Sequence, residues 1–267
     1  MSPAPIGIRW TVGDVSAHGF ESLRLSIWGV VRVFGAQPRY SVCVNGLDVG
    51  EAHRRTAPVP DFVTWRRCGG LPASIAAHLD AGMAEGVAWK FAPPRLFPDR
   101  YELALDNDCI LWQMPDAIRR WLDAQDGRCL IAADITLAHG AFTHLTGPQP
   151  RNTGIKGLPP GFDLEHAVVS VLDRHPVLLR SELDEQGLQV VAIERAGPAY
   201  VVSCEDVWLC SPFWPKAPRL GRCGAHFVGL NMKVVPWSYE GRPALELLQA
   251  NWLGHRDTLY RRVGLAA

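Results

Sequence analysis

The sequence predicts an α/β fold in which a mostly parallel central sheet is flanked by helices. Short apolar segments alternate with segments of helical periodicity over the first sixty residues, which is the pattern of a parallel sheet. The chain has 267 residues, of which 48% are hydrophobic and 20% charged, enough for one large core. No polar linker separates two independently folded parts, so we expect residues 1–267 to form a single domain.

Strands are predicted where a short apolar run ends at glycine or a polar turn, and helices where apolar residues recur every three to four positions. In the first part of the chain these rules predict a strand at Ile6–Val12, a helix at Phe20–Phe34, a strand at Tyr40–Val44, a helix at Ala73–Glu85 and a strand at Tyr101–Leu105. Residues 50–72 are rich in Arg, Pro and Gly, so we expect loops there.

The second part of the chain is less regular. Pro115 is favourable at the start of a helix, and Ser181 to Asp184 has the form of a capping box. The remaining elements expected are a strand at Cys129–Asp134 and helices at Asp163–Asp173 and Pro243–Arg262. The Gly- and Pro-rich stretch Gly147–Gly161 leads into the helix at Asp163, and the Pro-rich stretch Trp208–Gly224 is expected to be irregular.

Composition excludes several classes of protein. Lys plus Arg and Asp plus Glu each number 27, so the formal net charge is zero and no nucleic-acid surface is predicted. The N-terminus lacks the pattern of a signal peptide, and no apolar run is long enough to span a membrane. The seven cysteines have neither zinc-site nor disulfide-framework spacing, so we expect reduced thiols in a cytoplasmic protein.

Two carboxylates stand where the strand Tyr101–Leu105 leaves the core. Asp106, Asn107 and Asp108 follow this strand directly, and another apolar run begins at Cys109. Burying two carboxylates close together is costly unless a cation holds them, and a divalent ion with oxygen ligands commonly carries phosphates. The pair therefore points to metal-assisted chemistry on a phosphorylated substrate, although an ordinary turn has the same pattern.

Several further polar clusters follow in a fixed order along the chain. They are Asp14 after the first strand, Lys90 sixteen positions before Asp106, Asn152-Thr-Gly154, Asp184-Glu-Gln-Gly187, His226-Phe-Val-Gly229, Lys233 and Pro236-Trp237. Together with the Asp pair, this order resembles the retaining, nucleotide-sugar-dependent glycosyltransferases of the glycogenin and galactinol synthase type. The resemblance spans Asp14 to Trp237 and implies the GT-A fold, a Rossmann-like nucleotide-diphospho-sugar transferase domain. Residues 1–110 would form its nucleotide-binding half and 111–267 its acceptor and catalytic half.

A metal site follows from both the residue types and the resemblance. Asp106 and Asp108 supply oxygen ligands and His226 an imidazole nitrogen, a set that suits Mn²⁺ or Mg²⁺ better than structural zinc. Such an ion neutralises a leaving nucleoside diphosphate as a Lewis acid. A histidine such as His226 also occurs as an ordinary core or surface residue, but its flanking Gly and Lys favour a ligand.

The resemblance assigns the remaining residues to the nucleotide-sugar. Lys90 and Lys233 are candidate diphosphate clamps, with Arg95 close enough in sequence to compete with Lys90. The others are Asp14 beside the nucleoside, Asn107 and Gly229 within the binding motifs, Asn152 and Glu185 near the sugar, and Gln186 at the sugar or acceptor.

Three departures from the family pattern affect these assignments. Glu185 stands where the family has Asp and has Asp184 beside it, so either carboxylate is a candidate to face the sugar. Lys233 and Pro236-Trp237 come later after His226 than the pattern requires, and the context of Asn152 is more polar. Because of these departures the substrate and the stereochemistry of the reaction stay open. The expected metal–diphosphate site is not affected by them.

The leading hypothesis is a metal-dependent glycosyltransferase that moves a sugar from a nucleotide-sugar, UDP-sugar by resemblance, to an acceptor hydroxyl with retention. A nucleotidyltransferase or nucleotide-sugar hydrolase is an alternative. The loop Gly13–Gly19 contains no Lys or Arg, which disfavours a nucleotidyltransferase. A nucleotide- or sugar-binding protein without transferase activity is the other alternative. The sequence does not predict the sugar, the acceptor or the oligomeric state.

Overall fold

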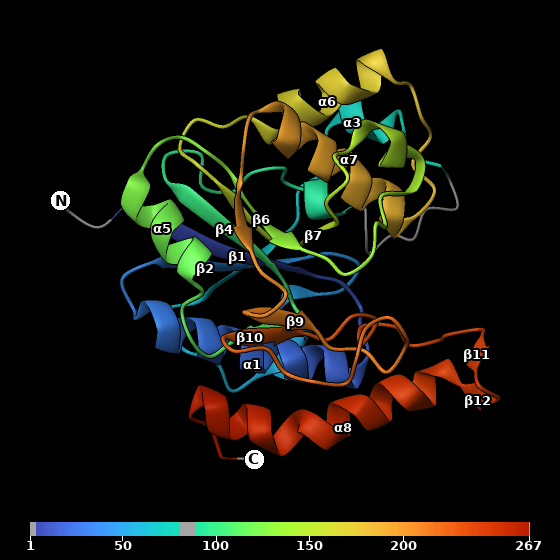
Figure 1. Cartoon of the computed structure of the whole chain (residues 1–267). Coiled ribbons are helices and arrows are strands. Elements are labelled where there is room, and N and C mark those ends of the chain that lie inside the picture. The colour runs from blue at the N-terminus through green and yellow to red at the C-terminus, as the bar shows by residue number, and fades with distance from the viewer. Residues whose placement is uncertain (1–3, 81–88, 267) are drawn as a thin grey trace.

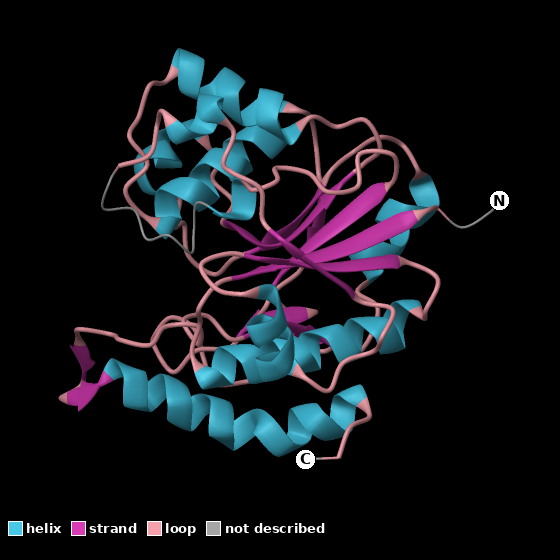
Figure 2. Ribbon diagram, turned by 180° about the vertical axis from the view of Figure 1, so that it is seen from behind, coloured by secondary structure: helices cyan, strands magenta, loops and turns pink. Residues whose placement is uncertain are grey.

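The structure is a computed structural model that describes residues 4–80 and 89–266. A central sheet runs through the molecule, with helices on both faces (Figures 1 and 2). The strands are β1 (Ile6–Val12), β2 (Arg39–Val44), β3 (Thr64–Arg67), β4 (Tyr101–Asp106), β5 (Cys109–Leu111), β6 (Leu130–Ala133), β7 (Arg151–Leu158), β8 (Tyr200–Val202), β9 (Val207–Leu209), β10 (Gly224–His226), β11 (Ser238–Tyr239) and β12 (Arg242–Pro243).

The main sheet has seven strands in the order β3-β2-β1-β4-β7-β6-β8. The pairs from β3 through β2 and β1 to β4 are parallel, as is β6 with β8, whereas β7 runs antiparallel to both of its neighbours. The predicted single α/β domain with a mostly parallel sheet is confirmed. Strands from residues 1–110 and 111–267 share this sheet, because β4 pairs with β7.

Helices cover the two faces and bury separate parts of the core. They are α1 (Ala17–Phe34), α2 (Val49–Thr56), α3 (Ala73–Ala76), α5 (Asp116–Ala124), α6 (Leu164–Arg174), α7 (Glu182–Arg195) and α8 (Ala244–Val263), with short 3₁₀ segments η1 (Trp89–Phe91) and η2 (Gly140–Leu145). Helices α3, α6 and α7 lie on the opposite side of the sheet from α1 and α8 (Figure 1). One apolar core lies between the sheet and α1 and α5, and another beneath α6 and α7.

A small second sheet packs against α1 and α8. Its strand order is β5-β10-β9, and β10 pairs antiparallel with β5, which places His226 opposite Cys109. A third apolar core, with Trp252 and Ile110 buried in it, joins this sheet to α8. The consequence for the site is that β10 lies beside the turn that follows β4.

Most elements with strong apolar periodicity are where the sequence predicts them. Helix α7 begins with the predicted capping box: the Ser181 hydroxyl accepts a hydrogen bond from the Asp184 N–H, and the Asp184 carboxylate accepts one from the Ser181 N–H. All seven cysteines are free thiols, five of them buried. Among the described residues, no helix combines the length and apolarity needed to cross a membrane.

One segment expected to be a loop contains regular structure. Within residues 50–72 the structure has most of α2 and all of β3. Helix α2 begins at Asp48, whose carboxylate accepts the Glu51 N–H, a cap that the sequence spacing would have revealed. Strand β3 is polar and exposed, and its backbone pairing with β2, a tertiary contact, makes it a strand.

The Gly- and Pro-rich stretch Gly147–Gly161 contains β7, a central strand. Glycines occur within this strand because neighbouring side chains take the space that a Cβ would fill. A Cβ on Gly154 would lie 2.4 Å from His226, and one on Gly157 would lie 2.7 Å from Trp121.

The helix predicted at Ala73–Glu85 is shorter in its described part. It ends at Ala76, because the backbone of His78 and Asp80 pairs instead with Leu179. Residues 81–85 of the prediction lie outside the described residues. The stretch Trp208–Gly224 is irregular as expected, except at its two ends in β9 and β10.

Candidate functional site

The fold brings the three predicted metal ligands together. Asp106 ends β4, the chain turns through Asp108, and β5 then pairs with β10 so that His226 lies beside the turn. The His226 Nε2 is 3.2 Å from Asp108 Oδ1 and 3.7 Å from Asp106 Oδ2. One ligand atom from each residue lies within 4.8 Å of the others, which suits a single ion.

Burial and charge make this cluster suitable for a cation. Asp108 and His226 are buried, and Asp106 is 22% exposed at the side chain. The buried Oδ1 of Asp108 accepts no hydrogen bond from the described residues. Burial alone would lower the pKa of His226, but the Asp108 and Asp106 carboxylates outweigh it and raise this pKa. Two carboxylates and an imidazole fit Mn²⁺ or Mg²⁺ by the chemistry of the donors and by this unsatisfied oxygen.

Asn107, between the two carboxylates, holds the turn in place. Its Nδ2 donates to the Gly19 carbonyl at 3.1 Å and to Asn231 Oδ1 at 2.6 Å. Asn231 in turn donates to Asp108 Oδ2 at 3.1 Å. Asn107 was predicted to contact the nucleotide-sugar, whereas its amide is occupied by these protein groups. Asn231, which the sequence analysis did not single out, orients a metal ligand.

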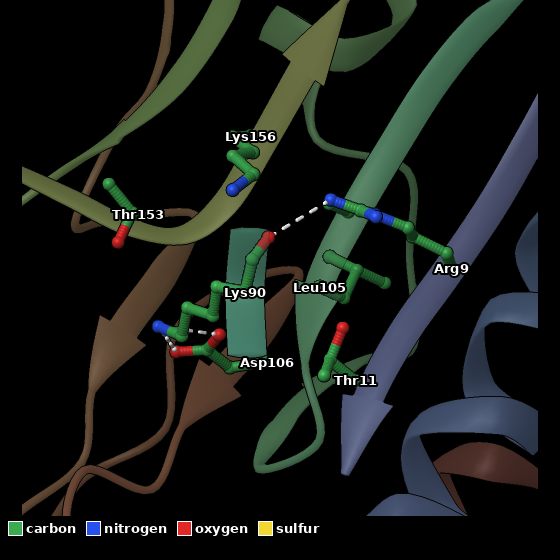
Figure 3. A pocket seen from close by; sticks show the side chains of 8 residues that line it. Arg9, Thr11, Lys90, Leu105, Asp106, Thr153 and Lys156 are labelled. Carbon is green, nitrogen blue, oxygen red and sulfur yellow. Dashed lines mark hydrogen bonds and ion pairs between the residues drawn. The ribbon is translucent and has the colours of Figure 1, made fainter. Parts of the chain in front are cut away.

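Lys90 lies directly against Asp106. Its Nζ is 3.0 Å from both carboxylate oxygens and 3.8 Å from Glu185 Oε2. Burial would lower the pKa of Lys90, but Asp106 and Glu185 raise it, so the ammonium is charged. Figure 3 shows Lys90 and Asp106 projecting into the same pocket as Lys156.

A buried ion pair holds the segment that presents Lys90. The Arg9 Nε is 3.0 Å from Glu102 Oε1, and both side chains are almost completely buried. Arg9 also donates to the carbonyls of Pro93, Pro94 and Lys90, while Glu102 accepts the N–H groups of Leu96 and Phe97. The sequence analysis missed this pair, because its members are 93 residues apart and pair across β1 and β4.

Arg95, the predicted competitor of Lys90, points elsewhere. Its guanidinium donates to the carbonyls of Phe162 at 2.6 Å and of Arg100 at 2.8 Å. Those backbone contacts hold the Arg95 guanidinium away from the Asp pair. Of Lys90 and Arg95, it is therefore Lys90 that contacts Asp106.

The two neighbouring carboxylates of α7 have different surroundings. Both oxygens of Asp184 accept backbone N–H groups, from Ala141 at 2.8 Å and from Arg180 at 2.8 Å and Ser181 at 3.1 Å. Asp184 is therefore a helix cap that also holds η2. Glu185 is 1% exposed and faces Lys90 and Gln189. Burial raises the pKa of Glu185, while Lys90 and Lys156 oppose that rise.

Asn152 and Gln186 lie next to each other in the structure. The Asn152 Nδ2 donates to Asp134 Oδ2 at 3.1 Å, and its Oδ1 accepts the Gly154 N–H at 2.7 Å. Gln186 donates to the Ala138 carbonyl at 2.8 Å and accepts the Thr153 N–H at 3.4 Å. These contacts place both amides along the edge of β7 that leads to His226, which packs over Gly154.

Asp14 and Lys233 come together at the end of β1. The Lys233 Nζ is 2.5 Å from Asp14 Oδ2, and the Arg55 Nη1 is 2.9 Å from Asp14 Oδ1. Hydrogen bonds from Lys233 and then Arg55 lower the pKa of Asp14. Gly229, with a φ of 88°, lets the chain turn between His226 and Lys233. The predicted clamp Lys233 is thus paired with the predicted nucleoside residue, and Arg55 joins them.

A cavity of about 20 Å³ lies beside the metal cluster, lined by Lys90, Asp106, Lys156, Thr153 and Arg9 among others. Its lining comes from β1, β4, β7 and η1, near the carboxyl ends of β1 and β4. Ligands of open α/β sheets bind at such an edge. The arrangement offers two carboxylates and an imidazole as ligands for one cation, with the Lys90 ammonium beside them.

No protein-family model matches this sequence, and no curated protein is similar to it in sequence. Solved structures are similar in fold. The galactosyltransferase LgtC, in complex with donor and acceptor sugar analogues, has a TM-score of 0.56 at 12% identity, over 97% of this chain and 95% of that chain. Mouse xyloside xylosyltransferase 1 has a TM-score of 0.56 at 12% identity, over 87% and 100%. The apo-form glycosyltransferase GlyE of Streptococcus pneumoniae has 0.51 at 11% identity, over 97% and 62%.

At these identities the likeness is one of fold. The chain therefore has the GT-A fold of nucleotide-diphospho-sugar transferases.

Proposed function

We propose that this protein is a metal-dependent glycosyltransferase that moves a sugar from a nucleotide-sugar to an acceptor hydroxyl. The observation that carries the proposal is the convergence of Asp106, Asp108 and His226, with Lys90 against Asp106. In this fold, at this edge of the sheet, the cluster suits a metal-bound diphosphate. The solved structures of similar fold are glycosyltransferases, which supports the reaction class.

Mn²⁺ or Mg²⁺ would be held by Asp106, Asp108 and His226, and would supply charge neutralisation for the leaving nucleoside diphosphate. Lys90 adds a fixed ammonium at the same place, where negative charge grows as the bond between the sugar C1 and the phosphate oxygen breaks. A new bond then joins C1 to the acceptor oxygen, and the acceptor's proton passes to the departing phosphate oxygen or to water. Lys233 and Arg55 lie at the end of β1, where the nucleotide would bind.

The sugar would lie between the metal cluster and α7. Glu185 is the carboxylate of the pair that faces this region, and Gln186 and Asn152 supply amides beside it. A carboxylate under the sugar stabilises positive charge at the anomeric carbon. The order of motifs similar to glycogenin and galactinol synthase supports a UDP-sugar donor and retention at that carbon.

The proposal is tested by incubating the protein with a panel of nucleotide-sugars, with and without Mn²⁺ or Mg²⁺, and separating the nucleotides released. We expect release of a nucleoside diphosphate from one donor class, dependent on the metal, and its loss in Asp106→Asn. Release of pyrophosphate would identify a nucleotidyltransferase instead. Metal-dependent donor binding without any turnover, even hydrolytic, would identify a binding protein.

A further inference from the structure

A row of buried polar side chains leads from β7 to the donor site. Lys156 on β7 donates through Nζ to Gln189 Oε1, and Gln189 donates through Nε2 to Glu185 Oε1. The other oxygen of Glu185 lies 3.8 Å from Lys90, which contacts Asp106. Lys156 is 2% exposed, Glu185 1% and Gln189 0%. Three side chains thus connect the middle of the sheet to the metal cluster.

Burying this row of polar side chains costs free energy of folding, so a role in function would explain why the row is present. A lone buried ammonium or carboxylate is strongly unfavourable, and even a paired one is often no more stable than apolar residues of equal volume. The pKa of Lys156 is lowered to about 7. Burial is the main cause, and the positive charges of Arg9 and Lys90 act in the same direction, whereas the carboxylates of Glu185 and Asp106 oppose them. Arg9 is already satisfied by Glu102 and backbone carbonyls. Lys156 therefore has Gln189 as its hydrogen-bond partner among the described residues.

Lys156 at one end of the row and Glu185 at the other determine the orientation of the Gln189 amide between them. A carboxylate only accepts hydrogen bonds, so Gln189 must present its NH₂ group to Glu185. Its oxygen then faces Lys156, whose Nζ–H donates to it, so the two ends require the same orientation. The amide hydrogen bond occupies Oε1 of Glu185 and leaves Oε2 directed towards Lys90.

We propose that Lys156 and Gln189 are positioning residues, which hold Glu185 as a carboxylate with one oxygen directed towards Lys90 and the donor sugar. This inference rests on the proposed glycosyltransferase function, and it adds two residues to the site that are linked to Glu185 by hydrogen bonds. They act through Glu185, so they affect the rate of transfer and not the binding of the diphosphate. A 1 Å misplacement of a catalytic group costs up to about 100-fold in rate.

The test is a double-variant cycle with Lys156→Met, Gln189→Leu and the double variant. Methionine and leucine remove the hydrogen bonds at similar volume. Lys156→Met leaves Gln189 Oε1 without its donor, and Gln189→Leu leaves both Lys156 and Glu185 without their partner. In the double variant only Glu185 loses a partner, and its Oε2 still faces Lys90. The double variant therefore loses less stability than Gln189→Leu and keeps the test possible if that variant fails to fold. Glu21→Gln is the control, because Glu21 of α1 is another largely buried glutamate and is held by Trp252, Arg256 and Tyr260 of α8.

The measured quantities are kcat and KM with the best donor found for the wild-type protein, and thermal stabilisation by Mn²⁺ with UDP. We expect the double variant to lose about 10- to 100-fold in kcat, with KM for the donor changed less than about 3-fold. Any single variant that folds should lose the same factor, so that the changes are not additive. Glu21→Gln should keep its kcat.

Two outcomes overturn the inference separately from the proposed function. Wild-type kcat in the double variant would show that the row is structural only. Additive losses spread equally over kcat and KM would show that Lys156 and Gln189 do not act through Glu185. If the wild-type protein turns over no nucleotide-sugar, the proposed function fails first, as its own experiment shows.

Discussion

Replacing Asp108 by asparagine is expected to weaken metal binding while leaving the stability of the fold almost unchanged. Asparagine keeps a side-chain oxygen for the Asn231 Nδ2, which lies 3.1 Å from Asp108 Oδ2. It removes one of two negative charges that lie close to His226 and each other. We therefore expect the metal-free variant to be within about 1 kcal/mol of the wild type in free energy of unfolding.

The metal response should differ sharply. Mn²⁺ at 100 times its Kd stabilises the wild type by about 2.7 kcal/mol. For a domain of this size that raises Tm by about 5–10 °C. Loss of an outer-shell partner alone weakens metal binding by about 10- to 100-fold, and Asp108 is a direct ligand. At the same Mn²⁺ concentration a 100-fold weaker site leaves about 0.4 kcal/mol, a shift of about 1–2 °C.

The assay is thermal unfolding with a Mn²⁺ titration on both proteins. Asp206→Asn is the matched control, because Asp206 is also buried but pairs with Arg222 at the opposite end of β9 and β10 from His226. It should lower Tm and keep the Mn²⁺ shift. A Mn²⁺ shift in Asp108→Asn equal to that of the wild type would refute the metal assignment.

Three further outcomes are expected. Lys90→Met should lower kcat by about 10²- to 10³-fold in steady-state kinetics, because a fixed positive group at the leaving phosphate is lost; an unchanged kcat would contradict its role. Gly154→Ala should abolish the Mn²⁺ shift and cost about 1–3 kcal/mol, since its Cβ would lie 2.4 Å from His226; calorimetry that shows a normal shift would contradict this. The wild type should gain up to about 1.4 kcal/mol of stability per pH unit above pH 7, because folding lowers the pKa of Lys156 from 10.5 to about 7 and the unfolded chain binds the extra proton between those values. Urea unfolding at pH 7, 8 and 9 should show this rise in the wild type and not in Lys156→Met, whereas equal slopes would contradict it.

Local patterns in the sequence determined the class of fold and the metal cluster. The strand ends at Asp106, the capping box at Ser181 and the periodicity of α1 and α8 depend on residues a few positions apart, which a single sequence displays directly. The residue types of Asp106, Asp108 and His226 indicated a cation site. The tertiary structure brought the three within reach of one ion, through the pairing of β5 with β10.

Contacts between distant segments decided the rest. Strand β7 is central although its glycines are typical of a loop, because His226 and Trp121 occupy the space beside them. The direction of α7 turns Asp184 to backbone amides and Glu185 towards Lys90. Strand order and helix orientation decide which side chains meet, and they arise from burial over the whole chain. For that reason Lys156 and Gln189, 33 residues apart, gave no signal until the fold placed them together.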